Sequence, residues 1–269
     1  MEKLPRISQE ILGFSLSAEE NFPNDQICDR GKGNMKRVVA LVPAAGRGRR
    51  MGSEVPKTSL LLGGIPLLKH TLFKFETCRE IQEVIPLVPP EEVPFWEEEI
   101  LQKKEIKKVR RILAGGEERQ DSVFLGLQAV AGEAEIVVIH DGARPFVSPE
   151  LIKNTLAEME NFQAVITALP VEDTVKEISP RKEVVKTLER SFLWFVQTPQ
   201  TFTYSLIFYA HEKAHKENFF GTDDAALIER LGIPVRVIEG SRLNFKITTP
   251  EDLLLAEALL KYQQQEKLK

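Results

Sequence analysis

The stretch VVALVPAAGRGRRM, residues 38–51, joins a short apolar run to a loop of small and basic residues. An apolar run that stops abruptly at Pro43 is typical of a buried parallel strand whose carboxyl end opens into a loop. Gly46 and Gly48 let the backbone approach a ligand closely, and the N–H groups of such a turn can face an anion. This end of the predicted strand is therefore a candidate ligand site.

The loop also concentrates positive charge, although the chain carries a formal net charge of −4. Its basic residues are Arg47, Arg49, Arg50 and Lys57. Basic side chains on a glycine loop at a strand end predict a polyphosphate site. A dinucleotide fingerprint needs a third glycine where Met51 stands, and a Walker A loop needs glycine, not Pro56, directly before its lysine. The loop therefore matches neither of these two common motifs in full.

The composition bounds the class of protein. With 269 residues, 42% hydrophobic and 28% charged, the chain has ordinary globular proportions and the length of one large α/β domain. The absence of a long basic stripe argues against nucleic acid as the main partner. No apolar run approaches the roughly 20 residues that span a bilayer, so no membrane partner is expected. Two cysteines are too few for a disulfide framework and predict a reducing cytoplasm.

From Lys36 onward, strand and helix patterns alternate as they do in parallel α/β proteins. Strands are expected at Val38–Val42, Val84–Val88, Val109–Leu113, Ile136–Ile139, Ala164–Ala168 and Val235–Ile238. Helices are expected at Leu67–Glu76, Val93–Lys103, Asp121–Ala131, Pro149–Met159, Ser205–Lys216, Asp223–Leu231 and Pro250–Tyr262. We therefore predict an α/β fold with a mostly parallel sheet.

Three parts of the chain depart from the alternation. Residues 170–198 hold short β-prone pieces without a helix of the expected length, and they predict a protruding arm of the kind that often serves oligomerisation. Residues 1–34 are either a disordered tail or a misassigned start, since residues 30–34 fit purine-rich codons resembling a ribosome-binding site directly before Met35. Residues 263–269 read as a polar tail, which leaves one domain over residues 35–262.

Two later segments are candidate ligand loops. Residues 115–123, GGEERQDSV, follow an expected strand, so their N–H groups and Ser122 could bind a nucleobase or ribose; a plain turn with Asp121 or Ser122 as helix cap explains them equally well. Asp141 ends another expected strand, where it could hold a divalent metal on phosphate oxygens. The alternative is an Asp141 that caps its loop and pairs with Arg144. His140 is expected to support this loop.

Isolated charges complete the candidates. Lys246 lies in an apolar-flanked run just before the last expected helix, which is unusual for a surface lysine. Arg190 in the arm has the pattern of an ordinary surface charge, and Asp223 and Asp224 indicate the start of a helix. No arrangement typical of a serine or cysteine nucleophile stands out.

Taken in order, these segments resemble the 2-C-methyl-D-erythritol 4-phosphate cytidylyltransferases of the non-mevalonate isoprenoid pathway. The matching motifs, spread over about residues 36–262, are residues 43–51 with Pro56-Lys57, Gly115-Gly116 with Arg119 and 121–123, His140-Asp141 with 143–145, Pro170-Val171 with Asp173-Thr174, residues 198–200, Thr222-Asp223, and Asn244, Lys246, Thr248 and 250–253. The resemblance implies a Rossmann-like nucleotidyltransferase core with a protruding β-arm and a homodimer. It also implies transfer of CMP from CTP to 2-C-methyl-D-erythritol 4-phosphate with release of pyrophosphate.

The resemblance further implies roles for single residues. Arg50 and Lys57 correspond to transition-state stabilisers on the CTP phosphates. Contacts to CTP are implied for Ala44, Ala45, Gly46, Gly116, Ser122, Asp141 and Arg144. Asp141 is also the expected ligand of Mg²⁺ or another divalent cation. Substrate-positioning roles are implied for Lys246 and for Thr174 and Arg190, the last two reaching the neighbouring subunit's methylerythritol phosphate.

Some features depart from the family pattern or allow other functions. Family members usually carry Gln and an aromatic residue where Thr58-Ser59 stand, and Asp is common at Glu117; we expect altered base or loop contacts with activity retained. The alternatives are a cytidylyltransferase for another polyol phosphate such as ribitol 5-phosphate, a non-catalytic CTP-binding module, and a redox dinucleotide enzyme. Retention of Arg50 and Lys57 argues against the second, and the missing third glycine against the third.

Overall fold

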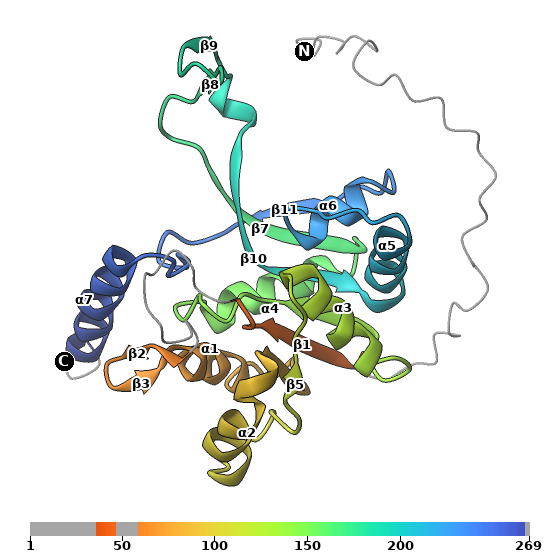
Figure 1. Ribbon diagram of the computed structural model, residues 1–269, viewed down its shortest axis with the longest axis vertical. Coiled ribbons are helices and arrows are strands. Elements are labelled where there is room, and N and C mark those ends of the chain that lie inside the picture. Colours follow the sequence, from red (N-terminus) through yellow and green to blue (C-terminus); the bar gives the residue numbers. More distant parts are fainter. Residues whose placement is uncertain (1–35, 47–58, 267–269) are drawn as a thin grey trace. The chain divides into compact units, whose positions relative to one another are not determined.

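A seven-stranded sheet forms the centre of the fold, in the order β11-β7-β10-β6-β1-β4-β5 (Figure 1). The computed structural model describes residues 36–46 and 59–266. The strands of this sheet are β1 (Val38–Pro43), β4 (Glu83–Val88), β5 (Leu113–Ala114), β6 (Ile136–Ile139), β7 (Ala164–Pro170), β10 (Trp194–Thr203) and β11 (Arg236–Glu239). Strand β10 runs antiparallel to both of its neighbours, whereas the other pairs are parallel. The predicted α/β fold with a mostly parallel sheet is confirmed.

Helices cover both faces of this sheet. They are α1 (Leu67–Glu76), α2 (Val93–Trp96), which continues as a π-helical segment (Glu97–Gln102), α3 (Arg119–Ala129), α4 (Pro149–Glu158), α5 (Tyr204–Lys216), α6 (Asp224–Glu229) and α7 (Pro250–Glu266). Alternate residues of β1 face opposite cores: Ala40 packs with residues of α1, α2 and α4, and Leu41 packs with residues of α3, α5 and α6. Because both faces are covered, β1 is apolar throughout rather than alternating.

One expected strand was wrong in its bounds, and one strand of the sheet was not among those expected. The strand expected at Val109–Leu113 is reduced to Leu113–Ala114, because the chain turns at Val109, whose N–H donates to the carbonyl of Ile106. Strand β10 was not expected as a central strand, since a proline disfavours such a position. The structure accommodates Pro199 at a bulge between Gln197 and Gln200, where the register with β7 shifts.

The arm leaves the sheet between β7 and β10 (Figure 1). It carries the antiparallel pair β8 (Lys176–Ile178) and β9 (Val184–Thr187), followed by a 3₁₀ turn (Arg190–Phe192). A second small hairpin, β2 (Leu61–Leu62) with β3 (Ile65–Pro66), packs near α7, where Leu62 and Ala256 share a third apolar cluster. Within the described residues, no helix has the length and apolar character needed to cross a bilayer.

Candidate active site

Three loops meet at the carboxyl edge of the sheet. A Cβ atom added to Gly115, after β5, would lie 2.6 Å from the Cβ of Ala45, after β1. A Cβ atom added to Gly142, after β6, would lie 3.1 Å from the Cβ of Ala44. At Gly115 a side chain would force the two loops apart, whereas at Gly142 the neighbours would have to yield by a few tenths of an ångström. The residues predicted to contact CTP on these loops are therefore brought together.

The loop after β5 is folded onto the first turn of α3. Ser122 Oγ, which is buried, accepts a hydrogen bond from the Gly116 N–H at 3.0 Å and donates to the Glu118 carbonyl at 3.1 Å. The expected cap, Asp121 or Ser122, is corrected to Glu118, whose N–H donates to the Asp121 carboxylate at 3.2 Å. Asp121 is thus the third residue of the helix and supports its start. Ser122 fixes the conformation of the glycine loop.

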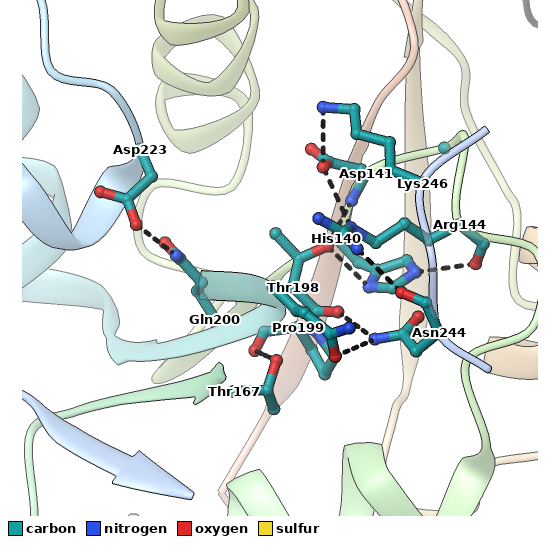
Figure 2. Close-up of polar contacts among 12 residues, drawn as sticks. His140, Asp141, Arg144, Thr167, Thr198, Pro199, Gln200, Asp223, Asn244 and Lys246 are labelled. Carbon is teal, nitrogen blue, oxygen red and sulfur yellow. Dashed lines mark hydrogen bonds and ion pairs between the residues drawn. The ribbon is translucent and has the colours of Figure 1, made fainter. Parts of the chain in front are cut away.

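Asp141, at the end of β6, is surrounded by cations although it is only 6% exposed (Figure 2). Its Oδ1 accepts from Arg119 Nε at 3.0 Å, and its Oδ2 lies 2.9 Å from Lys246 Nζ and 3.4 Å from Arg144 Nε. Burial alone would raise the pKa of Asp141, but the charges of Arg119, Lys246 and Arg144 outweigh it and hold the pKa well below its ordinary value. Asp141 is therefore a carboxylate at neutral pH, in a setting rich in positive charge.

Arg119 connects this carboxylate to a second buried acid. Its Nη1 lies 2.7 Å from Asp224 Oδ2, and Asp224 Oδ1 is 3.1 Å from His211 Nε2. Burial would lower the pKa of Arg119, but Asp224 and Asp141 more than compensate and raise it. Of the two acids expected to start a helix, only Asp223 caps α6, by accepting from the Ala226 N–H at 3.0 Å. Asp224 is the first residue of α6, as expected, but its ion pair with Arg119 was not anticipated from the sequence, which left Arg119 as a motif residue without a role.

The loop segment that carries Lys246, between β11 and α7, is held from both sides. Asn244 Nδ2 donates to the Thr198 carbonyl at 2.8 Å, and the Asn244 carbonyl accepts from Arg144 Nη1 at 2.8 Å (Figure 2). On the other side of Lys246, the N–H of the next residue, Ile247, donates to the carbonyl of Ala143 at 2.9 Å. These bonds place the half-exposed Lys246 against Asp141. The apolar flanks of Lys246 in the sequence were the signal of this placement.

His140 supports the same loop from below. Its Nδ1 lies 3.1 Å from Thr198 Oγ1 and its Nε2 lies 3.2 Å from the Arg144 carbonyl, while Thr198 Oγ1 also accepts from the Asp141 N–H at 3.0 Å. Complete burial lowers the pKa of His140 to about 4. A neutral, doubly hydrogen-bonded imidazole is a structural support, as the sequence had suggested.

The remaining predicted site residues lie apart from this cluster or outside the described residues. Gly46 is exposed, and a Cβ atom there would meet no atom within 4 Å. Thr174 and Arg190 lie on the exposed arm, where the Arg190 guanidinium donates to the Glu172 carbonyl. Arg50 and Lys57, together with Thr58, fall outside the described residues.

A cavity of about 470 Å³ opens beside Arg119. It is lined by the start of α3 and the loop before α6, namely Glu118, Arg119, Gln120, Phe220, Gly221 and Thr222. Gln120 joins the two walls, because its Nε2 donates to the Phe219 carbonyl at 2.8 Å and its Oε1 accepts from the Gly221 N–H at 2.9 Å. Among the described residues, no group of three or more His, Cys, Asp or Glu side chains is arranged to hold a metal ion.

Three cations gathered around a buried carboxylate at the carboxyl edge of a mostly parallel sheet, beside glycine loops, are typical of nucleotide-binding α/β enzymes. The comparisons specify it further. Residues 38–262 match the family model described as IspD, 2-C-methyl-D-erythritol 4-phosphate cytidylyltransferase, and the chain belongs to this family. It is therefore a nucleotidyltransferase, and the family's reaction is CTP-dependent cytidylyl transfer to 2-C-methyl-D-erythritol 4-phosphate in isoprenoid biosynthesis, as the sequence resemblance implied.

Known relatives agree in sequence and in fold. The chain is 47% identical over 225 residues to the 2-C-methyl-D-erythritol 4-phosphate cytidylyltransferase of Syntrophus aciditrophicus, covering 84% of this chain and 96% of the relative. It is 48% identical to the enzyme of the same name from Bacillus cereus, over 83% of this chain and 97% of the relative. The crystal structure of 4-diphosphocytidyl-2C-methyl-D-erythritol synthase from Anaerococcus prevotii superposes with a TM-score of 0.75 at 35% identity, over 84% of this chain and 96% of that one.

Proposed function

We propose that the cluster around Asp141 is the centre at which the chain joins CMP to the phosphate of methylerythritol phosphate. The observation that carries the proposal is the contact of Lys246 with Asp141 Oδ2, 2.9 Å apart, beside the packed loops of Ala45 and Gly115. The glycine loops hold CTP on one side of Asp141. Lys246 receives the phosphate of the second substrate on the other side.

The reaction needs positioning and charge neutralisation more than a base. A phosphate oxygen of methylerythritol phosphate attacks the α-phosphorus of CTP; a new P–O bond forms as the bond to the β-phosphate breaks, and pyrophosphate leaves with the electron pair. A phosphate dianion is already a nucleophile, so no proton has to be removed. Arg50 and Lys57 stabilise the added negative charge on the CTP phosphates, and Lys246 keeps the second anion in line.

Asp141 is the side chain we propose as ligand of Mg²⁺ or another divalent cation. Such cations are usually bound in phosphate-transfer sites by one or two carboxylates together with the substrate's own phosphate oxygens, so a single buried carboxylate fits. When bound, the cation would neutralise charge on the CTP phosphates. Arg144, 3.4 Å from Asp141 and bonded to the Asn244 carbonyl, would keep the carboxylate facing the phosphates.

We propose that the arm forms a homodimer and brings Thr174 and Arg190 to the substrate of the partner subunit. Its support is an exposed apolar surface on the arm, where Phe192 is 83% and Phe195 is 61% exposed. Large exposed apolar side chains that cluster on one element mark interaction surfaces. Replacing both phenylalanines with serine should give monomers in sedimentation equilibrium. Leu254→Ser, which removes an equally exposed side chain on α7, should leave the dimer intact; a dimer that survives the double change in the arm would refute this interface.

Location and chain limits are also proposals. We propose a cytoplasmic enzyme, supported by a cysteine content too low for a disulfide framework, with Cys78 a buried free thiol. The catalytic domain is proposed to span residues 35–262, supported by a family match that begins at residue 38, where β1 also begins. Mass spectrometry of the natural N-terminus tests whether translation starts at Met35. Recovery of residues 1–34 would refute that start.

Pyrophosphate release from CTP tests the proposed function directly. Release should be fast with 2-C-methyl-D-erythritol 4-phosphate and slow with ribitol 5-phosphate, and the reverse order would assign the chain to the other polyol phosphate. Lys57→Ala should lower turnover by about 10²-fold or more without changing the melting temperature, because one preorganised cation is lost. Lys261→Ala, at an exposed position of α7, is the matched control. Near-normal turnover of Lys57→Ala would contradict the role of that lysine.

A further inference from the structure

The three cations around Asp141 are not held alike. Lys246 has a side chain that is 35% exposed, and among the described residues its ion pair is with Asp141 alone. Arg119 instead bridges two carboxylates, with its Nε 3.0 Å from Asp141 Oδ1 and its Nη1 2.7 Å from Asp224 Oδ2. Asp141 Oδ1 is thus held by the bridging Arg119, whereas Oδ2 is shared by Lys246 at 2.9 Å and, at the longer distance of 3.4 Å, by Arg144.

The anchor of Arg119 is the most buried part of the network. The Asp224 side chain is 1% exposed, and its second oxygen faces His211, whose side chain is fully buried, at 3.1 Å. Asp224 belongs to α6, His211 to α5 and Arg119 to the first turn of α3, so three helices fix the guanidinium. A guanidinium that spans two carboxylates has its plane and direction set, which a single ammonium does not achieve.

The charges around Asp141 favour an anion as the next ligand. Three cations, Arg119, Arg144 and Lys246, face two carboxylates, Asp141 and Asp224, which leaves one positive charge in excess. A substrate phosphate beside Lys246 competes with Asp141 for this ammonium, because a phosphate dianion attracts it more strongly than a carboxylate that is already paired. Asp141 Oδ2 then becomes the oxygen that can change its partner.

From this asymmetry we infer that Arg119 is a positioning residue, which holds Asp141 Oδ1 while Oδ2 exchanges Lys246 for the divalent cation. The inference rests on the proposed role of Asp141 as metal ligand. Asp224 acts through Arg119 and touches neither substrate. Loss of Arg119 should leave the Asp141 carboxylate free to rotate toward Lys246 and to keep its ion pair with that lysine. The divalent cation would then lose Asp141 as its ligand, and the substrate phosphate would lose Lys246.

The test measures how strongly Mg²⁺ tightens CTP binding. Calorimetry gives the CTP dissociation constant with Mg²⁺ and with EDTA, and the ratio of the two reports the metal contact without any turnover. For Arg119→Gln we expect this ratio to fall about 10-fold, while CTP affinity in EDTA stays within about two-fold of the wild-type value. Arg119→Lys keeps one charge but cannot bridge two carboxylates, so it should give an intermediate ratio.

Arg111 offers a matched control. Its side chain is 32% exposed against 29% for Arg119, and it also bridges two acids, Glu83 through Nε at 3.0 Å and Glu133 through Nη2 at 2.9 Å. It precedes β5, at the end of the sheet away from Asp141, because Glu83 begins β4. Arg111→Gln should therefore reduce stability to a similar extent and leave the Mg²⁺ ratio and kcat unchanged.

Asp141→Asn separates the two possible failures. If Asp141→Asn lowers the Mg²⁺ ratio and Arg119→Gln does not, Arg119 has no positioning role, while the proposed metal site stands. If Asp141→Asn leaves the ratio unchanged, the metal assignment fails and the inference fails with it. Equal changes for Arg119→Gln and Arg111→Gln would also overturn the inference, since stability alone would then explain both.

Discussion

Replacing Gly115 with alanine adds a single methyl group between the loops after β1 and β5, which we propose to hold CTP. The new Cβ would lie 2.6 Å from the Cβ of Ala45 and 2.7 Å from Ser122 Oγ. Ordinary contact begins near 3.4 Å, so the gap between Gly115 and Ala45 must open by about 0.8 Å. Both neighbours are short side chains next to backbone, and neither can move aside by rotating a long side chain.

The expected effect falls on CTP more than on the second substrate. A displacement near 1 Å in a catalytic site costs about 10²-fold, so kcat/KM for CTP should fall by roughly 10- to 100-fold. Overpacking of this kind also costs about 1–3 kcal/mol of stability, which corresponds to a melting temperature lower by several degrees. The KM for methylerythritol phosphate should change little, because Lys246 contacts Asp141 Oδ2, whereas the Gly115 loop leads into Arg119, which contacts Oδ1.

Steady-state kinetics with each substrate varied in turn, together with thermal unfolding, measures these effects. Ala45→Gly removes one of the two clashing groups and serves as the rescue. If the steric explanation holds, the double variant should have a higher kcat/KM for CTP than the product of the single effects predicts. A Gly115→Ala enzyme with kcat/KM for CTP within two-fold of the wild type, or strict additivity of the two changes, would refute the reasoning.

Three further predictions concern residues that contact Asp141 or its loop. The pKa of His140 is about 4 in the folded chain, against an ordinary value of 6.5, so the unfolded chain binds more protons between these pH values. The free energy of unfolding, measured with urea, should therefore fall by about 2 kcal/mol from pH 7 to pH 5. The fall should be smaller in His140→Gln. Lys246→Met should raise the KM for methylerythritol phosphate at least ~10-fold, with a smaller effect on CTP, and equal effects on both would contradict its placement. Thr198→Val should cost about 1–3 kcal/mol, because the Asp141 N–H loses its acceptor, whereas Thr198→Ser should retain most of the stability.

The parts of the fold that could be predicted from the sequence are those where local pattern and burial agree. Strand β1 was expected at Val38–Val42 and is found at Val38–Pro43, because a strand covered on both faces must be apolar at every position. Helix α1 was expected and found at Leu67–Glu76. The antiparallel β10 could not be predicted in the same way, since Pro199 is tolerated there only through a bulge that pairing with β7 creates.

The candidate site likewise contains residues that could be proposed from the sequence and residues that could not. Residues directly after strands, such as Ala45 and Asp141, could be proposed from the sequence, because the carboxyl ends of parallel strands meet at one edge. The distant cations that pair with Asp141 could not be proposed in this way. Arg119 and Lys246 reach it from segments 22 positions before and 105 positions after it in the chain, and only the folded sheet brings them within 3.0 Å. The ion pair of Asp224 with Arg119 was not foreseen, because the start of α6 already explained both Asp223 and Asp224.

The strand that sequence reasoning failed to place also ties the arm to the site. Strand β10 begins at Trp194 in the arm and ends beside β6, and between these points Thr198 accepts from the Asp141 N–H at 3.0 Å. One residue before, Gln197 Nε2 donates to the Ser241 carbonyl at 2.9 Å, in the segment that leads to Lys246. At the bulge itself, the Thr167 hydroxyl of β7 donates to the Pro199 carbonyl at 3.2 Å. The strand that leaves the arm is therefore hydrogen-bonded both to Asp141 and to the segment that precedes Lys246.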